Sequence, residues 1–401
     1  MDPTIWPTWP LHFKAPFGLA IALLCAGLGG ELVARFARVP RITGYSLAGL
    51  LMGPAVFGWF GRDDVAGLRI AVDLALALLL FELGVRLDVR WFRANPWILV
   101  SSIAEALLSF VLTFMVLRWL DYSNGMSATV AAIAVSTSPA VVMRVVAEIR
   151  AEGQVTQRLL ALCALNVAYS LVLSNLIVGG MHGVFRNDWT AALLHPLYLI
   201  GGSLAIGAAL AWAFRQLRRS LDLSDEQGVV VLFGLLLFAL ALLKTLKLPG
   251  MLAPLIAGAI VKYMDPRPHL WPRHFGTAGG VLVVPLFMLT GMSVTLGEIA
   301  AGGLAGLALL LARAVGKGAG VALTGPVSGI TRRQAIALGV ALLPMSGVAF
   351  VIAEDIRLMY PDFGAKLVPL VMSMMVVMEL LGPFAVQRAL QGVGENNTGD
   401  R

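Results

Sequence analysis

The chain has 401 residues, of which 58% are hydrophobic and 13% are charged, and its mean hydropathy is +0.84. A soluble domain carries about 25% charged residues, so this composition excludes a soluble enzyme, a disordered protein and a fibrous repeat. The side chains must instead face lipid. The net charge of +7 comes mostly from basic residues between apolar runs, which indicates membrane topology rather than nucleic-acid binding.

Thirteen apolar runs are long enough to cross a bilayer of about 30 Å as helices. In chain order they cover 16–36, 42–59, 67–85, 96–119, 126–147, 157–179, 190–214, 226–245, 248–264, 276–295, 299–324, 332–353 and 365–387. The second and ninth runs are short and glycine-rich, which favours tilted or partly broken helices. The sequence therefore predicts an all-α polytopic membrane protein with about 13 transmembrane helices.

The basic residues predict the orientation of these helices. With the N-terminus outside, basic residues on the inner side outnumber those on the outer side by two to one. We therefore expect the N-terminus outside and the C-terminus in the cytoplasm of the bacterial inner membrane. The first residues lack a basic n-region and a clear cleavage site, so we expect no cleavable signal peptide. The polar tail 391–401 is expected to be disordered.

The two halves of the chain resemble each other at an offset of 206 to 208 positions. Residues 80–84 are matched by 286–291, Gly44 by Gly250, and residues 136–141 by 344–349. Six runs, one linker run and six further runs would place the second unit upside down. Inverted-topology repeats of this kind are typical of secondary transporters, whose site lies near the midplane where broken helices meet.

Two of the runs contain helix-breaking residues at positions related by this offset. The fifth run holds Ser136, Thr137, Ser138 and Pro139, and the twelfth holds Pro344, Met345, Ser346 and Gly347. Proline removes a backbone donor, and hydroxyl groups can satisfy freed backbone groups or bind a cation. For either element alone a simple proline kink is an equal alternative. The matched placement favours two broken helices that cross in the core, where these residues would line an ion site.

Three motifs resemble a known family. RVPRITGY at 38–45, followed by LAGLLMGP at 47–54, is similar to the opening motif of the monovalent cation:proton antiporter superfamily, of the sodium/hydrogen exchanger and potassium-efflux type. Residues 79–88 resemble its third-span signature, and Pro285 to Ser293 resembles its Pro-x-Phe…Gly-Met-Ser segment. The motifs occur in the family's order, and the resemblance covers nearly the whole chain.

The resemblance implies a homodimer that moves a small ion or solute together with protons within membrane lipid, with no cofactor, metal centre or nucleic acid. It implies a dimerisation domain from 1–95 and 226–298, and a core domain from 96–185 and 299–390 that moves like an elevator. Residues 186–225 would form the linker span between the repeats, and 391–401 the tail.

The chain departs from this family at the ion site. In the sixth span the family carries a pair of residues whose second member is an aspartate that binds the cation and exchanges it for protons. Here Asn166 fits the first position and Val167 occupies the second. Valine offers no lone pair and cannot titrate, so the alignment excludes ordinary sodium/proton exchange through this position.

Glu105, Arg313 and Lys317 are ionisable residues well inside predicted spans of the core, while Glu379 in the last run lies near the inner leaflet, where helix packing is preferred to a role as proton carrier. Such residues usually face a cavity or a partner. Adding the offset of 208 to Glu105 gives Arg313, so we expect the two to meet. The preferred interpretation is a structural Glu105–Arg313 ion pair, because a nearby arginine holds a carboxylate ionised. The alternative makes Glu105 a substitute proton carrier.

The sequence therefore predicts a secondary-active transporter, not an enzyme, with the cation:proton antiporter fold. Three alternatives stay open: an organic-anion transporter that uses the charges of Arg313 and Lys317, a uniporter or channel, and a scaffold or sensor that has lost transport.

Overall fold

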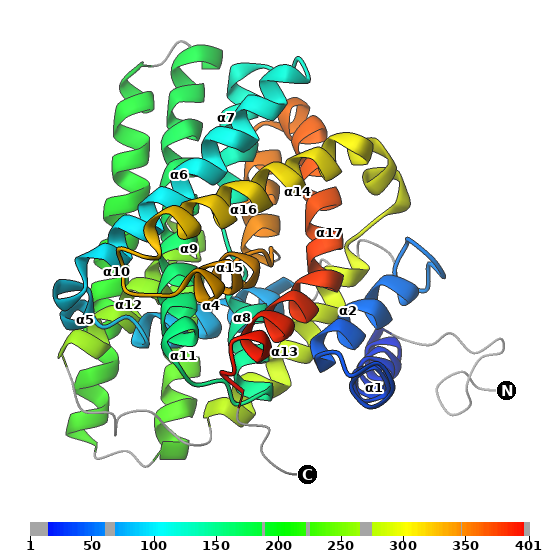
Figure 1. The fold of residues 1–401 in the computed structure, drawn as a ribbon. Helices are drawn as coiled ribbons and strands as arrows, with labels where there is room; N and C mark the ends of the chain where they lie inside the picture. The colour runs from blue at the N-terminus through cyan, green and yellow to red at the C-terminus, as the bar shows by residue number, and fades with distance from the viewer. Residues whose placement is uncertain are drawn as a thin grey trace, which may run out of the picture.

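The computed structural model describes residues 15–60, 69–186, 189–221, 225–264, 275–345 and 347–396. Within these ranges the fold is entirely helical (Figure 1), which confirms the predicted all-α class. Among the described residues, eight segments are long and apolar enough to cross a membrane by length and composition. Each of the thirteen predicted apolar runs coincides with a helix or a broken helix, while the number that cross a membrane stays a prediction.

The first half of the chain contains ten α-helices and one short π-helix within its described residues. They are α1 (Ala15–Leu32), η1 (Val33–Ala37), α2 (Arg41–Met52), α4 (Arg69–Val85), α5 (Val89–Ala94), α6 (Pro96–Trp119), α7 (Asn124–Val135), α8 (Pro139–Glu148), α9 (Gln154–Arg186), α10 (Trp189–Ser220) and α11 (Asp225–Thr245). The six-residue helix α5 was not predicted. It begins after Asp88, whose side chain accepts a hydrogen bond from the Arg90 amide.

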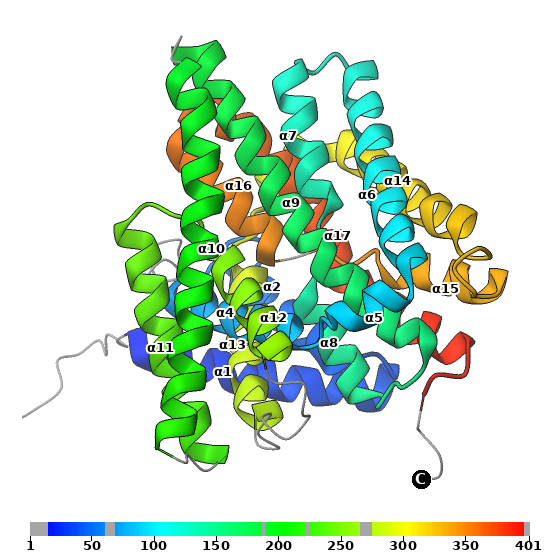
Figure 2. The ribbon, with the colours of Figure 1, turned by 90° about the vertical axis from the view of Figure 1, so that its left-hand side faces the viewer.

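The second half contributes the remaining described helices. They are α12 (Leu252–Met264), α13 (Phe275–Met292), α14 (Leu296–Thr324), α15 (Arg332–Ala341), α16 (Gly347–Met359) and α17 (Pro361–Gly392). Figure 2 shows α10 and α11 on the side of the bundle opposite to α6, α14 and α15.

Among the helix pairs that join the first half of the chain to the second are α2 with α13, α4 with α12, and α6 with α14. Glycines let the backbones approach: a Cβ atom at Gly49 would lie 2.1 Å from the Met288 carbonyl oxygen, and one at Gly84 would lie 2.2 Å from that of Leu255. Small residues serve the same purpose in membrane helices generally. These pairings are the ones that an inverted repeat predicts, and the repeat itself stays a prediction.

The two predicted breaks are present. The α7–α8 element is interrupted at residues 136–138, and the α15–α16 element is interrupted between Ala341 and Gly347. Pro139 occupies the first turn of α8, where no amide donor is needed, and Ser138 caps that helix by accepting from the Val141 amide at 3.3 Å. The breaks therefore have local causes in the sequence. Ser346 lies outside the described residues.

The expectation of a disordered tail from residue 391 is wrong for residues 391–396. Helix α17 continues to Gly392, and the Glu395 carboxylate accepts hydrogen bonds from the amides of Val155 and Thr156 at 2.8 and 2.7 Å. An anion at a helix N-terminus is stabilised by the helix dipole, so this end of the chain is attached to the start of α9.

Candidate functional site

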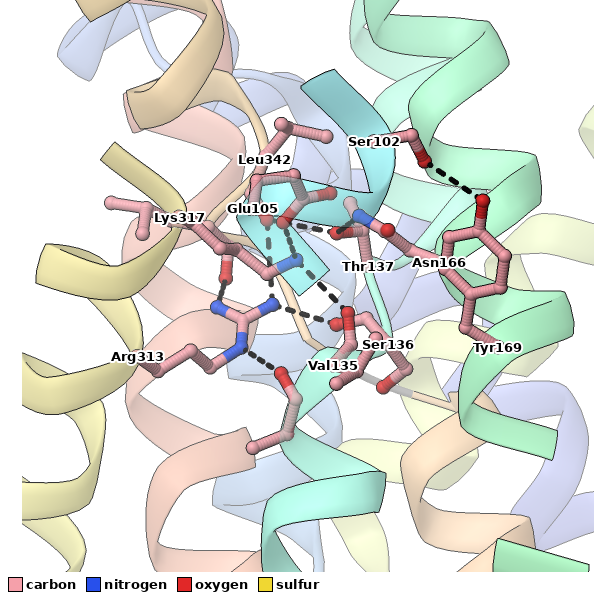
Figure 3. Close-up of polar contacts among 12 residues, drawn as sticks. Ser102, Glu105, Val135, Ser136, Thr137, Asn166, Tyr169, Arg313, Lys317 and Leu342 are labelled. Atoms are coloured by element: carbon pink, nitrogen blue, oxygen red, sulfur yellow. Dashed lines mark hydrogen bonds and ion pairs between the residues drawn. The ribbon is translucent and has the colours of Figure 1, made fainter. Parts of the chain in front are cut away.

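The two broken helices meet directly. The Ser138 amide donates to the Pro344 carbonyl oxygen at 2.9 Å, and the Thr137 hydroxyl donates to the Leu342 carbonyl oxygen at 3.0 Å. Asn166 on α9 donates from Nδ2 to Thr137 Oγ1 at 3.2 Å (Figure 3). All of these residues are buried. Irregular backbone at this depth needs such partners, because lipid offers none.

Arg313 on α14 contacts the C-terminal ends of α7 and α15, which are the first halves of the two broken helices. Its Nε donates to the Ala134 carbonyl oxygen and its Nη2 to that of Ser136, each at 2.7 Å, and its Nη1 donates to the Leu343 carbonyl oxygen. The carbonyl groups at a helix C-terminus lack helical partners and carry partial negative charge. The buried guanidinium group therefore satisfies the free carbonyl groups at the ends of α7 and α15.

Lys317, one turn further along α14, forms a second set of contacts. Its Nζ lies 3.0 Å from Glu105 Oε2 on α6 and donates to the Val135 carbonyl oxygen at 2.9 Å. The side chains of Lys317 and Glu105 are both 0% exposed. Figure 3 shows Lys317 and Arg313 side by side, both directed at the end of α7.

The expected ion pair between Glu105 and Arg313 is therefore wrong in its partner. The reason is the register of two antiparallel helices. A Cβ atom at Gly320 would lie 2.3 Å from the Glu105 Cα, and one at Gly316 would lie 2.5 Å from the Ser109 Cα. This register places Glu105 level with Lys317 and Gly320, while Arg313 lies about a turn further along α14.

Charged side chains and helix ends together set the charge of the crossing. Arg313 and Lys317 face one carboxylate, the C-termini of α7 and α15 contribute about −0.5 of an elementary charge each, and the N-termini of α8 and α16 about +0.5 each. The sum is about +1. Both cations are nevertheless engaged, because they contact carbonyl and carboxylate oxygens.

Val167, at the position that the resemblance predicts for the family's aspartate, lies in an apolar environment. Val167 is 0% exposed and belongs to the hydrophobic core. Next to it, Oδ1 of Asn166 is buried with no hydrogen-bond partner, and so is Oε1 of Glu105. Both atoms are acceptors, so the free polar groups of the site suit a cation or a hydrogen-bond donor.

The hydroxyl groups of the broken segments have local partners. Ser136 donates to the Ile133 carbonyl oxygen at 2.7 Å, while Ser138 caps α8. Pro139 and Pro344 are buried at the two breaks, and Pro344 contributes its carbonyl oxygen. In this arrangement the two serines stabilise the backbone.

One further acid, Glu379 on α17, is 2% exposed; the sequence favours helix packing for it over a role as proton carrier. The Ser46 hydroxyl lies 3.3 Å from Glu379 Oε1, and the Thr290 hydroxyl also donates to this oxygen. These partners lie 333 and 89 positions away in the sequence. The sequence pattern that could have indicated this site was one acidic residue, Glu379, within an apolar run.

Solved structures similar in fold cover almost the whole chain. The sodium proton antiporter MjNhaP1 from Methanocaldococcus jannaschii, at pH 8, matches with a TM-score of 0.68 and 20% identity over 95% of both chains. An electron-microscopy structure of MjNhaP1 matches with a TM-score of 0.73 and 16% identity over 96% of this chain and all of that one. At these identities the likeness establishes the fold.

Curated relatives match over shorter stretches. The Na(+)/H(+)-K(+) antiporter GerN of Bacillus cereus is 31% identical over 105 residues, which is 26% of each chain. The iron transporter MagA of Paramagnetospirillum magneticum is 29% identical over 137 residues, 34% of this chain and 31% of that one. The aligned stretches thus cover only about a quarter to a third of these relatives.

A family model extends across nearly all of the chain. The model described as "Sodium/hydrogen exchanger, transmembrane" matches residues 19–392, a range that includes the crossing helices, Glu105, Lys317 and Arg313. With that range and the fold together, the chain belongs to the sodium/hydrogen exchanger family of membrane transporters.

Proposed function

We propose that the chain is a secondary-active antiporter that exchanges a monovalent cation for protons without a titrating group at position 167. The observation that carries this proposal is the crossing of two broken helices, neutralised by Arg313 and Lys317. Ion sites of secondary transporters are built at such crossings. The buried Val167 argues that the coupling proton is carried elsewhere.

The free polar atoms of the site favour a cation over an organic anion. An anion needs donors, and the donors of Arg313 and Lys317 already contact carbonyl and carboxylate oxygens. Among the buried acceptors without partners are Oδ1 of Asn166 and Oε1 of Glu105, both next to the crossing. A partly dehydrated cation can use such oxygens as ligands. Potassium is the first candidate because the relative GerN is a Na(+)/H(+)-K(+) antiporter.

We further propose that Glu105 has a structural role. It neutralises Lys317, which in turn satisfies the Val135 carbonyl group. A proton carrier must lose its charge during each cycle, and neutralising Glu105 would leave Lys317 as an uncompensated buried charge. The proposal also includes the predicted homodimer, with the N-terminus outside and the C-terminus on the cytoplasmic side of a bacterial inner membrane. The excess of basic residues on that side supports this orientation.

The test is flux through the purified chain in proteoliposomes that contain a pH-sensitive dye. Pulses of K⁺, Na⁺, Li⁺ and a series of organic anions are compared at equal ionic strength. We expect proton movement with K⁺, little with Na⁺ or Li⁺, and none with the anions. Val167→Asp, which introduces the family's carboxylate, is expected to increase the response to Na⁺.

Each alternative predicts a different result. Proton movement with an anion alone would identify an organic-anion transporter, and cation flux without proton movement would identify a uniporter or channel. A well-folded chain that moves none of these solutes would favour a scaffold or sensor. Strong Na⁺ exchange by the unmodified chain would refute the reasoning about position 167.

A further inference from the structure

Glu379 is a buried carboxylate whose observed partners are neutral. Its Oε1 accepts hydrogen bonds from the hydroxyl groups of Ser46 on α2 and Thr290 on α13. No lysine or arginine among the described residues lies within ion-pair distance of it. Burial of an ionised carboxylate without a counter-ion is costly, so the neutral form of this group is accessible. Glu105, by contrast, has Lys317 beside it.

The charged groups on the helices packed against α17 have other partners or lie along other parts of those helices. Helices α7 and α13 carry no titratable side chain. The others carry Arg41 and Tyr45 on α2, Arg144 and Glu148 on α8, Glu298, Arg313 and Lys317 on α14, Arg332 and Arg333 on α15, and Glu354, Asp355 and Arg357 on α16; α17 itself adds Asp362, Lys366 and Arg388. Recorded ion pairs link Arg41 with Glu148, Arg357 with Glu354, and Asp355 with Arg69. None of these pairs includes Glu379.

A cavity of about 580 Å³ reaches Thr290, a hydrogen-bond partner of this carboxylate. Helices α4, α13, α14, α16 and α17 line it, and its lining includes Met372 and the charged residues Arg69, Glu298, Glu354 and Arg357. Met372 precedes Glu379 by seven residues, which is two helical turns on the same face of α17. Thr290 both lines the cavity and bonds to Glu379, so this residue links the cavity to the acid.

Thr290 can serve both protonation states of Glu379 without moving. Its Oγ1 lies 3.0 Å from the Phe287 carbonyl oxygen as well as in contact with Glu379 Oε1. When Glu379 is ionised, the threonine hydroxyl donates to it. When Glu379 is protonated, the acid can donate to Thr290 Oγ1 while the threonine hydrogen turns to Phe287, because a hydroxyl group both donates and accepts.

We propose that Glu379 binds and releases the proton that the transport cycle requires, and that the proton reaches it from this cavity past Thr290. The inference rests on the proposed antiport. The bonds of Glu379 connect α17 to α2 and α13, which come from the two parts that the family resemblance assigns to the core and the dimerisation domain. Loss of the carboxylate charge weakens these bonds, so protonation would be coupled to the movement of one part against the other.

Direct detection of the protonated acid tests the first half of this proposal without any flux. Infrared difference spectra of the reconstituted chain are recorded between about pH 5 and 9. We expect a band from a buried protonated carboxyl group that disappears in Glu379→Gln and persists in Glu379→Asp. Glu152→Gln, which removes an exposed carboxylate in the α8–α9 loop, is the matched control and should leave the band unchanged. In Thr290→Val the band should persist to higher pH, because the ionised form of Glu379 loses the hydrogen bond that the threonine hydroxyl donates.

A band that survives in Glu379→Gln, or the absence of such a band from the unmodified chain, would overturn the proposal. The second half is tested with the flux assay, where Glu379→Gln should abolish proton movement and Glu379→Asp should retain part of it. Unchanged flux and pH dependence in Glu379→Gln would remove Glu379 as the carrier while antiport itself stands. If the unmodified chain shows the expected band but moves no protons in the flux assay, the proposed antiport and the transport role of Glu379 would be refuted. The protonation of Glu379 itself would stand.

Discussion

Neutralising the two partners of the Glu105–Lys317 pair should reveal a strong energetic coupling between α6 and α14. Both side chains are fully buried and lie 3.0 Å apart. Removing one partner of such a pair leaves a lone buried charge and costs about 3–5 kcal/mol. Glu105→Gln should therefore lose about that much stability. Lys317→Met should lose about 1.5–3 kcal/mol more, because the Val135 carbonyl group also loses its charged donor.

The double variant Glu105→Gln/Lys317→Met has no lone charge. Its expected loss is about 1.5–3 kcal/mol, the value of the Val135 hydrogen bond alone. It should therefore be more stable than Lys317→Met, with a coupling energy of at least about 3 kcal/mol. In a chain of 401 residues, each kcal/mol corresponds to a shift of about 1–2 °C in melting temperature.

The assay is thermal melting of the purified chain in detergent, followed by the amount of protein that stays monodisperse. Glu105→Gln should melt about 3–10 °C below the unmodified chain. Additive losses in the double variant would refute the pairing and would return Glu105 to the list of free titrating groups. Equal losses of stability in Glu105→Gln and Lys317→Met would refute the contribution assigned to the hydrogen bond from Lys317 to the Val135 carbonyl oxygen.

Two further predictions concern other parts of the fold. Gly320→Ala should destabilise the chain by about 1–3 kcal/mol, because the added Cβ would lie 2.3 Å from the Glu105 Cα. The control Gly318→Ala should be neutral or stabilising, because an added Cβ there meets no atom within 4 Å. Equal melting temperatures of the two variants would contradict the α6–α14 register. His182 Nε2 and His195 Nδ1 lie 3.0 Å apart and join α9 to α10, so His195→Ala should remove this hydrogen bond and destabilise the chain by about 1–3 kcal/mol. The melting temperature of the variant should fall accordingly, and an unchanged value would contradict the contact.

Much of the fold follows from sequence patterns of short range. Apolar runs predict helices, and proline with neighbouring hydroxyl residues predicts both breaks. The short helix α5 was missed because its six residues are too few for a periodic pattern. The ordered segment to Asn396 was missed because polar composition alone does not indicate that Glu395 caps the start of α9.

The partners within the site could not be predicted in the same way. The repeat offset relates Glu105 to Arg313 by symmetry, but symmetry does not fix how far two antiparallel helices slide along each other. The glycines at 316 and 320 set that register by close approach, and it selects Lys317. The same limit applies to Glu379, whose hydroxyl partners come from two other helices.

The hydrogen bond from the Ser138 amide to the Pro344 carbonyl oxygen restricts substitutions differently at its two ends. Position 138 must keep its N–H group, since that group donates to the Pro344 carbonyl oxygen at 2.9 Å. Proline is therefore excluded at 138 although it is accommodated at 139, one residue away. Position 344 contributes a carbonyl oxygen, which every amino acid possesses, so this hydrogen bond places no restriction of its own on the side chain there. In divergent members of this fold the hydrogen bond alone should thus exclude proline at one position of the crossing and no residue at the other.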